Sequence, residues 1–304
     1  MHTQILVLGS GPAGCTAALY GAMAGFKTTL LMGILPGGQM IFTHEIENFP
    51  GYLSVSGMDL ARCFQEQIKA AGVQMIYENG EQVDFSNRPF SVRTGLGTVI
   101  TADSVIIATG SSARWLDIPG ESKLIGHGIS VCATCDGFFF KNKPVAVIGG
   151  GNTAAYEALF LAQLCEKVYI VHQGSQMTAA DYLMKKIYQN PKIILLPFQE
   201  AIAFKGDYKL IGLTIRHTQT HEQQHLTVSG AFEAIGQVPN THLFQGQLDM
   251  DPIGYLITNP ETLQTSIAGI FACGDVRAAA FHQAIIAAGS GCQAALSAKH
   301  FLIQ

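Results

Sequence analysis

Gly9-Ser10-Gly11-Pro12-Ala13-Gly14, near the start of this 304-residue chain, is the segment from which its architecture can be worked out. The apolar run Ile5 to Leu8 precedes this segment, and an alanine-rich stretch of helical character, Ala17 to Ala24, follows it. A strand, a tight turn and a helix in this order form the context that a dinucleotide-binding motif requires. The first glycine permits the turn, the second admits a pyrophosphate close to the backbone, and the third lets the helix pack on the strand. The pyrophosphate is expected at the positive end of the helix.

A second copy of the motif, Gly149 to Ala154, begins roughly one domain further along the chain. It follows the apolar run Val145 to Ile148, and it leads into a helical stretch, Ala155 to Leu164, and a strand-like run, Val168 to Val171. Ala154 replaces the last glycine, a variation that the motif tolerates. A chain of 304 residues with 48% hydrophobic residues is also longer than one core usually organises. We therefore predict an α/β protein with two doubly wound nucleotide-binding domains.

Charge and hydropathy argue against several kinds of partner. The net charge of −4 provides no basic field for nucleic acid, and no cluster of Lys and Arg overrides this balance. No apolar run approaches the length needed to cross a bilayer. Residues 1–4 contain no basic region, and residues 5–8 are too short for the core of a signal peptide, so the expected location is the cytoplasm.

Cys132-Ala133-Thr134-Cys135-Asp136-Gly137 contains the one pair of cysteines with a functional spacing among the seven in the chain. Half of a metal site, a coincidental spacing and a redox dithiol are the three interpretations. A zinc site needs two further Cys or His ligands at suitable spacing, and the sequence has no second pair of this kind, so we predict no metal. We favour the redox dithiol. The remaining cysteines are interpreted as small buried hydrophobic residues: Cys15, Cys63, Cys165, Cys273 and Cys292.

The chemistry of such a pair depends on the thiolate. One cysteine, made nucleophilic by a nearby charge or a helix start, attacks a disulfide or a flavin, and the other resolves the mixed disulfide. Asp136 follows the second cysteine directly, where it can move a proton between a thiolate and its partner. A helix-capping role is the alternative for Asp136, and the two roles are compatible.

Along essentially its whole length, the chain resembles the low-molecular-weight thioredoxin reductases of the bacterial type. The matching segments occur in the order that the family has: Gly9 to Gly14, Gly37-Gly38-Gln39, Glu47 to Gly51, Ala108-Thr109-Gly110, Cys132 to Phe139, Gly149 to Ala154, Ala234-Ile235-Gly236, Pro239-Asn240-Thr241, Gly274-Asp275-Val276 and Gln283-Ala284. Together these motifs are highly specific for the family.

The resemblance implies a discontinuous FAD-binding domain made of residues 1–112 and 242–304. Residues 113–241 would form an inserted Rossmann-like NAD(P)H-binding domain that carries the cysteine pair. Small antiparallel β meanders would accompany the parallel sheets. Hinges near Ser111 to Ala113 and Gln237 to Pro239 would let the inserted domain swing, because one face of the flavin cannot receive the disulfide and the nicotinamide at once. A homodimer through the FAD domain is also implied.

The resemblance also assigns roles to individual residues. Cys135 would face the flavin, Cys132 would attack the disulfide of thioredoxin or a thioredoxin-like protein, and Asp136 would be the acid and base. Asp275 would bind the ribitol hydroxyls, with a turn or cap role as the alternative. The expected FAD contacts are Gly9, Gly11, Pro12, Ala13, Gly14, Gln39, Asn48, Gly110, Asp275, His282, Gln283 and Ala284. The expected nicotinamide-nucleotide contacts are Gly149, Gly151, Asn152, Thr153 and Ala154.

The chain departs from the family pattern where NADPH-dependent members hold the 2′-phosphate with His-Arg-Arg and a further Arg. Here the stretch is His172-Gln173-Gly174-Ser175-Gln176-Met177-Thr178, which contains no arginine. A phosphate without a guanidinium partner loses charge-assisted hydrogen bonds worth about 1.5–3 kcal/mol each. The acid that NADH-dependent sites use is missing too, since none lies between His172 and Ala180. Compensation by His172, Lys185 or Lys186 is the alternative.

A second departure is His282, where the family usually has Arg before Gln-Ala. A histidine can still donate to the pyrimidine edge of the flavin, but its charge depends on pH. An ordinary solvated or core histidine is the alternative.

Three functional hypotheses follow. The first is a reductase of thioredoxin or a thioredoxin-like protein that takes electrons from a donor other than NADPH, such as ferredoxin. The second is an FAD-dependent dithiol oxidase that uses oxygen. The third is a flavin-binding regulatory module without turnover, which the retained Cys132, Cys135 and Asp136 argue against. We favour the first.

Overall fold

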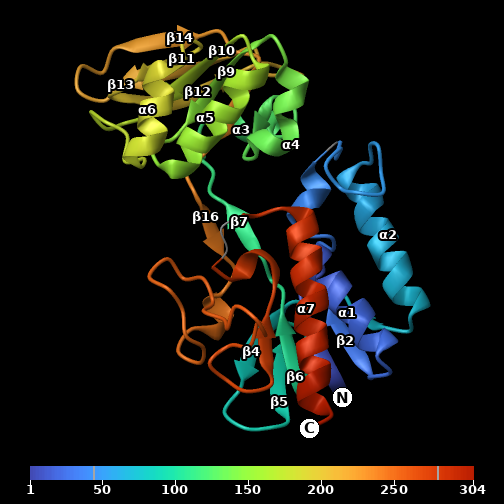
Figure 1. The fold of residues 1–304 in the computed structure, drawn as a ribbon. Helices are drawn as coiled ribbons and strands as arrows, with labels where there is room; N and C mark the ends of the chain where they lie inside the picture. The colour runs from blue at the N-terminus through green and yellow to red at the C-terminus, as the bar shows by residue number, and fades with distance from the viewer. Residues whose placement is uncertain (44, 279–280) are drawn as a thin grey trace. The chain divides into compact units, whose positions relative to one another are not determined.

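The structure is a computed structural model that describes residues 1–43, 45–278 and 281–304. The chain divides into two compact units, Met1–Ser112 with Val238–Gln304, and Ala113–Gln237 (Figure 1). The first unit is therefore discontinuous, with the second inserted into it. Residues 238–241, which the sequence assigned to the inserted domain, group with the first unit. Which nucleotide each unit binds stays a prediction.

The first unit is built on a seven-stranded sheet in the order β3 (Gln74–Ile76), β2 (Thr28–Leu31), β1 (His2–Leu8), β6 (Val99–Ile107), β5 (Phe90–Thr94) and β4 (Gly80–Asp84), with β17 (Ile270–Ala272) also paired to β6. The strands β1, β2, β3, β6 and β17 pair in parallel, while β4 and β5 form the antiparallel part. The apolar run in β1 is buried because parallel strands are covered on both faces.

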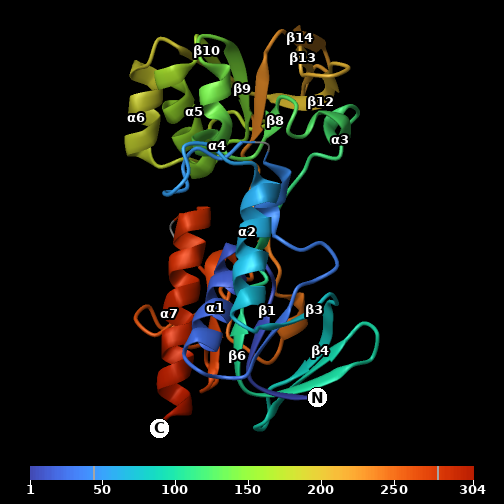
Figure 2. The same ribbon diagram turned by 90° about the vertical axis from the view of Figure 1, so that its right-hand side faces the viewer.

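Helices α1 (Pro12–Met23) and α7 (Ala284–Leu302) lie side by side on this unit (Figures 1 and 2). Small residues permit the close approach, since a β-carbon on Gly291 would lie 2.1 Å from the Ala13 carbonyl oxygen. Helix α2 (Gly57–Ala70) is capped at its N-terminus by Ser56, whose hydroxyl accepts a hydrogen bond from the Asp59 amide at 3.0 Å.

The second unit has a parallel five-stranded sheet in the order β11 (Ile193–Leu196), β10 (Lys167–Val171), β9 (Pro144–Ile148), β15 (Gly230–Glu233) and β8 (Ile129–Ser130). Alternate residues of β9 enter opposite cores: Val145 and Val147 pack with α5 (Asn152–Leu164) and α6 (Asp181–Gln189), while Ala146 and Ile148 pack with the antiparallel meander β12–β14. The meander strands are Gln199–Lys205, Gly212–His217 and Gln223–Leu226. The predicted α/β class with parallel sheets and small meanders is confirmed.

Two short strands connect the units, and several short helices lie between the longer elements. Strands β7 (Ser111–Ala113) and β16 (Gln237–Pro239), which contain the predicted hinges, pair as a two-stranded ribbon. The Thr109 hydroxyl donates to the Asn240 carbonyl at 2.8 Å, and the Asn240 side chain donates to the Thr109 carbonyl at 2.9 Å. The short helices are η1 (Gln39–Phe42), α3 (Glu121–Leu124), α4 (Ala133–Asp136), η2 (Gly137–Phe140), η3 (His242–Phe244) and η4 (Gly274–Val276). No helix among the described residues has both the length and the apolar character for a membrane crossing.

Two buried carboxyl groups share the backbone amide of Leu116 in the second unit. Glu121 accepts from this amide at 2.9 Å and from the Asp117 amide at 2.9 Å, while Glu233 accepts from Leu116 at 3.2 Å. The two side chains belong to residues that are 4% and 2% exposed. Burial, followed by the negative charge of Glu121, raises the pKa of Glu233 to about 9. Glu233 is therefore protonated at neutral pH.

This arrangement predicts a pH-dependent stability. Glu233 holds its proton more tightly in the folded protein than in the unfolded chain, where its pKa is near 4.5, so the free energy of unfolding falls as the pH rises between these values. Glu233→Gln, which is neutral at every pH, is expected to raise it by about 1–3 kcal/mol near pH 8 and to change it little near pH 4. Urea unfolding across this range tests the expectation, with the exposed Glu222→Gln as control. Equal pH slopes in wild type and Glu233→Gln would contradict it.

Candidate functional site

The first glycine motif has the geometry of a dinucleotide cradle. Gly9 has a φ of +104°, and a β-carbon there would lie 2.4 Å from the Ala108 carbonyl oxygen. A β-carbon on Gly14 would lie 1.8 Å from the Gly9 carbonyl oxygen. Gly11 is the N-cap of α1, and Pro12 occupies the first turn, where no backbone amide is needed. Side chains at Gly9 and Gly14 would clash with backbone, so glycines are needed for this turn and for the start of α1. The N-terminus of α1 fits the pyrophosphate of FAD.

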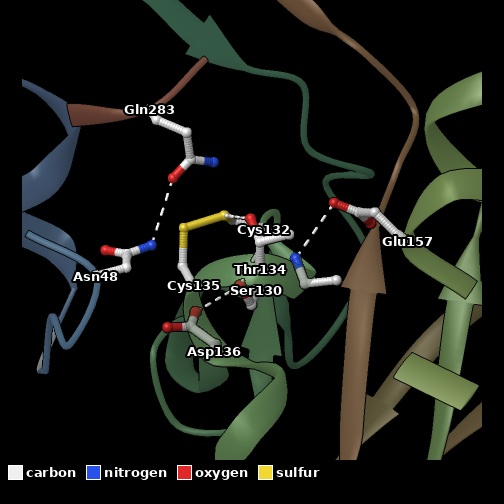
Figure 3. Close-up of a disulfide and its surroundings, with 9 residues drawn as sticks. Asn48, Ser130, Cys132, Thr134, Cys135, Asp136, Glu157 and Gln283 are labelled. Atoms are coloured by element: carbon white, nitrogen blue, oxygen red, sulfur yellow. Dashed lines mark hydrogen bonds between the residues drawn. A yellow bond between two sulfur atoms is a disulfide. The ribbon is translucent and has the colours of Figure 1, made fainter. Parts of the chain in front are cut away.

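Residues predicted to lie near the flavin come together within the first unit. The Asn48 side chain donates to the Gln283 side-chain oxygen at 3.3 Å although the two are far apart in sequence (Figure 3). Gln39 starts η1 immediately after Gly38, where a β-carbon would lie 3.0 Å from the Gly11 α-carbon. This places the loop that carries Gln39 against the first motif.

Asp275 belongs to a second group of predicted FAD residues. It lies in η4, and Gln283 and Ala284 form the N-cap and first residue of α7. Burial raises the pKa of Asp275, and the neighbouring charges of His282 and Arg277 oppose that rise. The charge of Arg277, a residue that the sequence did not single out, thus acts on Asp275. Gly110 has a φ of +68°, and no atom lies within 4 Å of the position of a β-carbon there.

The cysteine pair forms a disulfide in the second unit. Cys132 and Cys135 are bonded, with their α-carbons 5.3 Å apart, and Cys132 is the N-cap of the single-turn helix α4 (Figure 3). The backbone amides of Cys135 and Asp136 both donate to the Cys132 carbonyl, at 3.2 and 3.1 Å. A helical turn of this kind explains why a spacing of two residues suffices for the bond.

Asp136 is connected to the disulfide through Ser130. The Ser130 hydroxyl donates to Asp136 Oδ2 at 2.5 Å and accepts from the Cys132 backbone amide at 3.1 Å. Ser130, which is 8% exposed, therefore links the acid to the backbone of the first cysteine. Sequence reasoning selected Asp136 and missed Ser130, whose only signal is its place two residues before Cys132.

Glu157 is a further residue that sequence reasoning missed. It lies on α5, and its Oε1 accepts from the Ala133 amide at 3.3 Å, while its Oε2 is buried without a hydrogen-bond partner (Figure 3). Burial raises the pKa of Glu157 to about 7, and the Ala133 amide opposes that rise. The sequence did contain a signal for Glu157, because it is the only charged residue in the otherwise uncharged helix α5.

The second glycine motif repeats the cradle geometry. Gly149 has a φ of +143°, and a β-carbon there would lie 2.4 Å from the Ala234 carbonyl oxygen. Gly151 is the N-cap of α5, and Asn152 and Thr153 are its first exposed residues. The Asn152 side chain accepts from the Ala180 amide at 2.8 Å. The helix start is suited to a pyrophosphate, which fits the nucleotide predicted for it.

The loop after β10 contains no arginine and folds onto the second motif. The Thr178 amide donates to the Gly150 carbonyl at 2.7 Å. His172 is 5% exposed, its Nδ1 is buried without a partner, and burial lowers its pKa. A neutral imidazole supplies no charge for a 2′-phosphate. Lys185 and Lys186, the other residues named as compensating, are exposed on α6.

Comparisons with known proteins agree over the whole chain. A family model described as pyridine nucleotide-disulphide oxidoreductase matches residues 3–291. The thioredoxin reductase of Rickettsia conorii is 44% identical over 304 residues, which cover 99% of this chain and 98% of that protein. The thioredoxin reductase of Streptomyces coelicolor is 43% identical over 301 residues, covering 98% of this chain and 94% of that protein.

Solved structures give the same result. The thioredoxin reductase from Giardia duodenalis has a TM-score of 0.94 and 35% identity, covering 100% of this chain and 99% of that one. The thioredoxin reductase from Streptococcus pyogenes MGAS5005 also has a TM-score of 0.94 and 35% identity, covering 99% and 98% of the two chains. The resemblance noted in the sequence is confirmed.

Proposed function

Because this chain belongs to the pyridine nucleotide-disulphide oxidoreductase family and is an FAD-dependent disulfide oxidoreductase of the thioredoxin reductase type, we propose that it reduces thioredoxin or a thioredoxin-like protein. One observation carries the proposal: the Cys132–Cys135 disulfide lies on a helical turn whose backbone is tied through Ser130 to Asp136. An acid that is held beside a dithiol is suited to proton transfer during disulfide exchange.

The chain's own residues then act in a defined order. FAD, held at the first motif, would supply the electron pair that, with two protons, converts the disulfide into two thiols. Cys132 attacks the acceptor disulfide as a thiolate, which forms a mixed disulfide and releases one acceptor thiol. Cys135 attacks the Cys132 sulfur, restores the internal disulfide and releases the second acceptor thiol. Asp136 accepts and returns the proton of the attacking thiol.

The proposal includes a donor other than NADPH, either ferredoxin or another reductant. Its support is the neutral surface of the second motif, where His172 is buried and uncharged and residues 173–178 contain no cation. The absence of a cation for the 2′-phosphate is compatible both with the reductase and with a dithiol oxidase that uses oxygen. The reductase is preferred because Asp136 to Phe139 retains the pattern of the reductases.

An anaerobic titration of the flavin absorbance tests this proposal. We expect dithionite to bleach the flavin band, and stoichiometric NADPH to leave it unchanged; reduced ferredoxin, followed by thioredoxin, is the direct assay. Rapid bleaching by stoichiometric NADPH would refute the donor proposal and leave an NADPH-dependent thioredoxin reductase. Rapid oxygen uptake with a small dithiol and no other reductant would instead favour the oxidase.

We propose that the protein acts in the cytoplasm. The five other cysteines are free thiols, which agrees with a reducing compartment such as the cytoplasm. Cys15, Cys165 and Cys273 are buried as predicted, but the prediction is wrong for Cys63, which is exposed, and for Cys292, which is half-buried. We further propose a homodimer formed through the first unit. Sedimentation of the purified protein at several concentrations measures this directly.

A further inference from the structure

We propose that Glu157 is a positioning residue for the Cys132 sulfur, acting through the Ala133 amide and through its own negative charge. Ala133 follows Cys132 directly, and its amide donates to Glu157 Oε1 at 3.3 Å. The acid comes from α5, which packs against α4, so the turn that contains the disulfide is held by a side chain from outside it. This role goes beyond the proposed function, since Asp136 is the acid assigned to proton transfer there.

The two carboxyl groups beside the dithiol hold different amides. Asp136 acts through Ser130 on the Cys132 amide, whereas Glu157 holds the next amide, that of Ala133. Ala133 is 1% exposed, so its amide has little access to water. When Glu157 is ionised, it engages the Ala133 amide and adds a negative charge near Cys132. Both effects disfavour a second negative charge on the Cys132 sulfur.

Other charged groups occur on the elements packed against α5. They are Asp136 on α4, Lys167 on β10, and Asp181, Lys185 and Lys186 on α6. None of them is among the causes that set the protonation of Glu157, which are burial and the Ala133 amide. The buried Oε2 of Glu157 also lacks a hydrogen-bond partner, which favours the protonated carboxyl. With its pKa raised to about 7, Glu157 changes its charge near neutral pH.

A reciprocal effect follows from this coupling. Formation of the Cys132 thiolate makes the ionised form of Glu157 less favourable, so Glu157 takes up a proton from solvent as the thiol loses one. In the wild type, Cys132 thiolate formation should therefore extend over a wider pH range than that of an isolated thiol. With a neutral residue at position 157, one transition at lower pH should remain.

The experiment measures the rate of alkylation of Cys132 by iodoacetamide in the reduced protein between about pH 5.5 and pH 9.5. Mass spectrometry of the peptide that contains Cys132 separates it from the other thiols, and Cys135→Ser in all proteins prevents re-formation of the disulfide. Glu157→Gln, which keeps an oxygen acceptor for Ala133, is expected to lower the thiol pKa. For a fall of one pKa unit, the gain in thiolate and the loss in nucleophilicity give a rate about threefold higher at neutral pH.

Two further variants define what the result means. Glu157→Ala removes both the charge and the acceptor, and it should shift the profile in the same direction as Glu157→Gln. Glu166→Gln, an exposed acid on the same unit, should leave the profile unchanged. If Glu157→Gln keeps the wild-type pH profile, the proposal is wrong, whether or not Glu157→Ala folds. Because alkylation needs neither donor nor acceptor protein, its outcome is independent of the proposed function.

Discussion

Cys135→Ser is expected to abolish turnover with thioredoxin, with a fall of at least about 10³-fold, while the flavin stays bound and can be reduced by dithionite. The loss follows because a lone Cys132 cannot return to a disulfide within the protein. Cys135 is the cysteine assigned to the flavin side, and none of the first-unit residues that hold the cradle is changed. The measurement is steady-state reduction of thioredoxin with a donor that supports the wild type.

The two cysteines should also differ in what they trap. In Cys135→Ser, Cys132 still attacks the acceptor disulfide, so a mixed disulfide between the two proteins should accumulate on a non-reducing gel. In Cys132→Ser the attacking sulfur is gone, and no such adduct should form. Cys63→Ser is the matched control, because Cys63 is an exposed free thiol in the first unit. Turnover that survives Cys135→Ser would rule out the dithiol role, and an adduct in Cys132→Ser alone would reverse the assignment.

The second large effect is expected from arginines placed in the loop after β10. Gln173→Arg with Thr178→Arg should tighten NADPH binding by about 10- to 100-fold for each arginine, because each guanidinium adds charge-assisted hydrogen bonds to the 2′-phosphate. Both positions are exposed. Gly174 is left unchanged, since a β-carbon there would lie 2.9 Å from the Gln176 carbonyl oxygen. Affinities for NADPH and NADH come from calorimetric titration.

The ratio of the two affinities is the decisive quantity in this experiment. NADH lacks the 2′-phosphate, so its affinity should change little and the preference for NADPH should rise. Gln163→Arg with Gln189→Arg adds the same charge to the second unit, at the ends of α5 and α6 away from the motif, and should leave the ratio unchanged. A wild type that already binds NADPH tightly, and that the new arginines do not improve, would show that the neutral loop does not determine the donor.

Much of the fold could be predicted because its signals are local. Gly9 and Gly149 stand at positions where a β-carbon would meet a carbonyl oxygen at 2.4 Å, so the turn itself demands glycine there. The apolar runs before each motif are the central parallel strands, β1 and β9. The residue at which the chain re-enters the first unit was harder to predict from the sequence. This boundary depends on the pairing of β7 with β16, which joins segments more than a hundred residues apart.

The candidate site was predictable only in part, for a related reason. Cys132, Cys135 and Asp136 are neighbours in sequence, so their spacing, together with the absence of further metal ligands at suitable spacing, predicts a redox dithiol with an acid next to it. Glu157 reaches Ala133 from another helix, and this contact is a property of packing rather than of spacing. Burial likewise decides that His172 is neutral, which no pattern in its surrounding sequence indicates.

The ribbon of β7 and β16 has a consequence for how this chain could have been assembled. Residues 113–237 leave and rejoin the first unit through two paired strands, so both ends of the inserted segment meet at one joint. A segment with adjoining ends can be exchanged for another without separating the flanking ends of its host. The Cys132–Cys135 disulfide and the second glycine motif lie in this same inserted segment, so one exchange would move both. The disulfide or the second motif could therefore be altered, or the whole inserted segment replaced, without changing the first motif, Gly9 to Gly14.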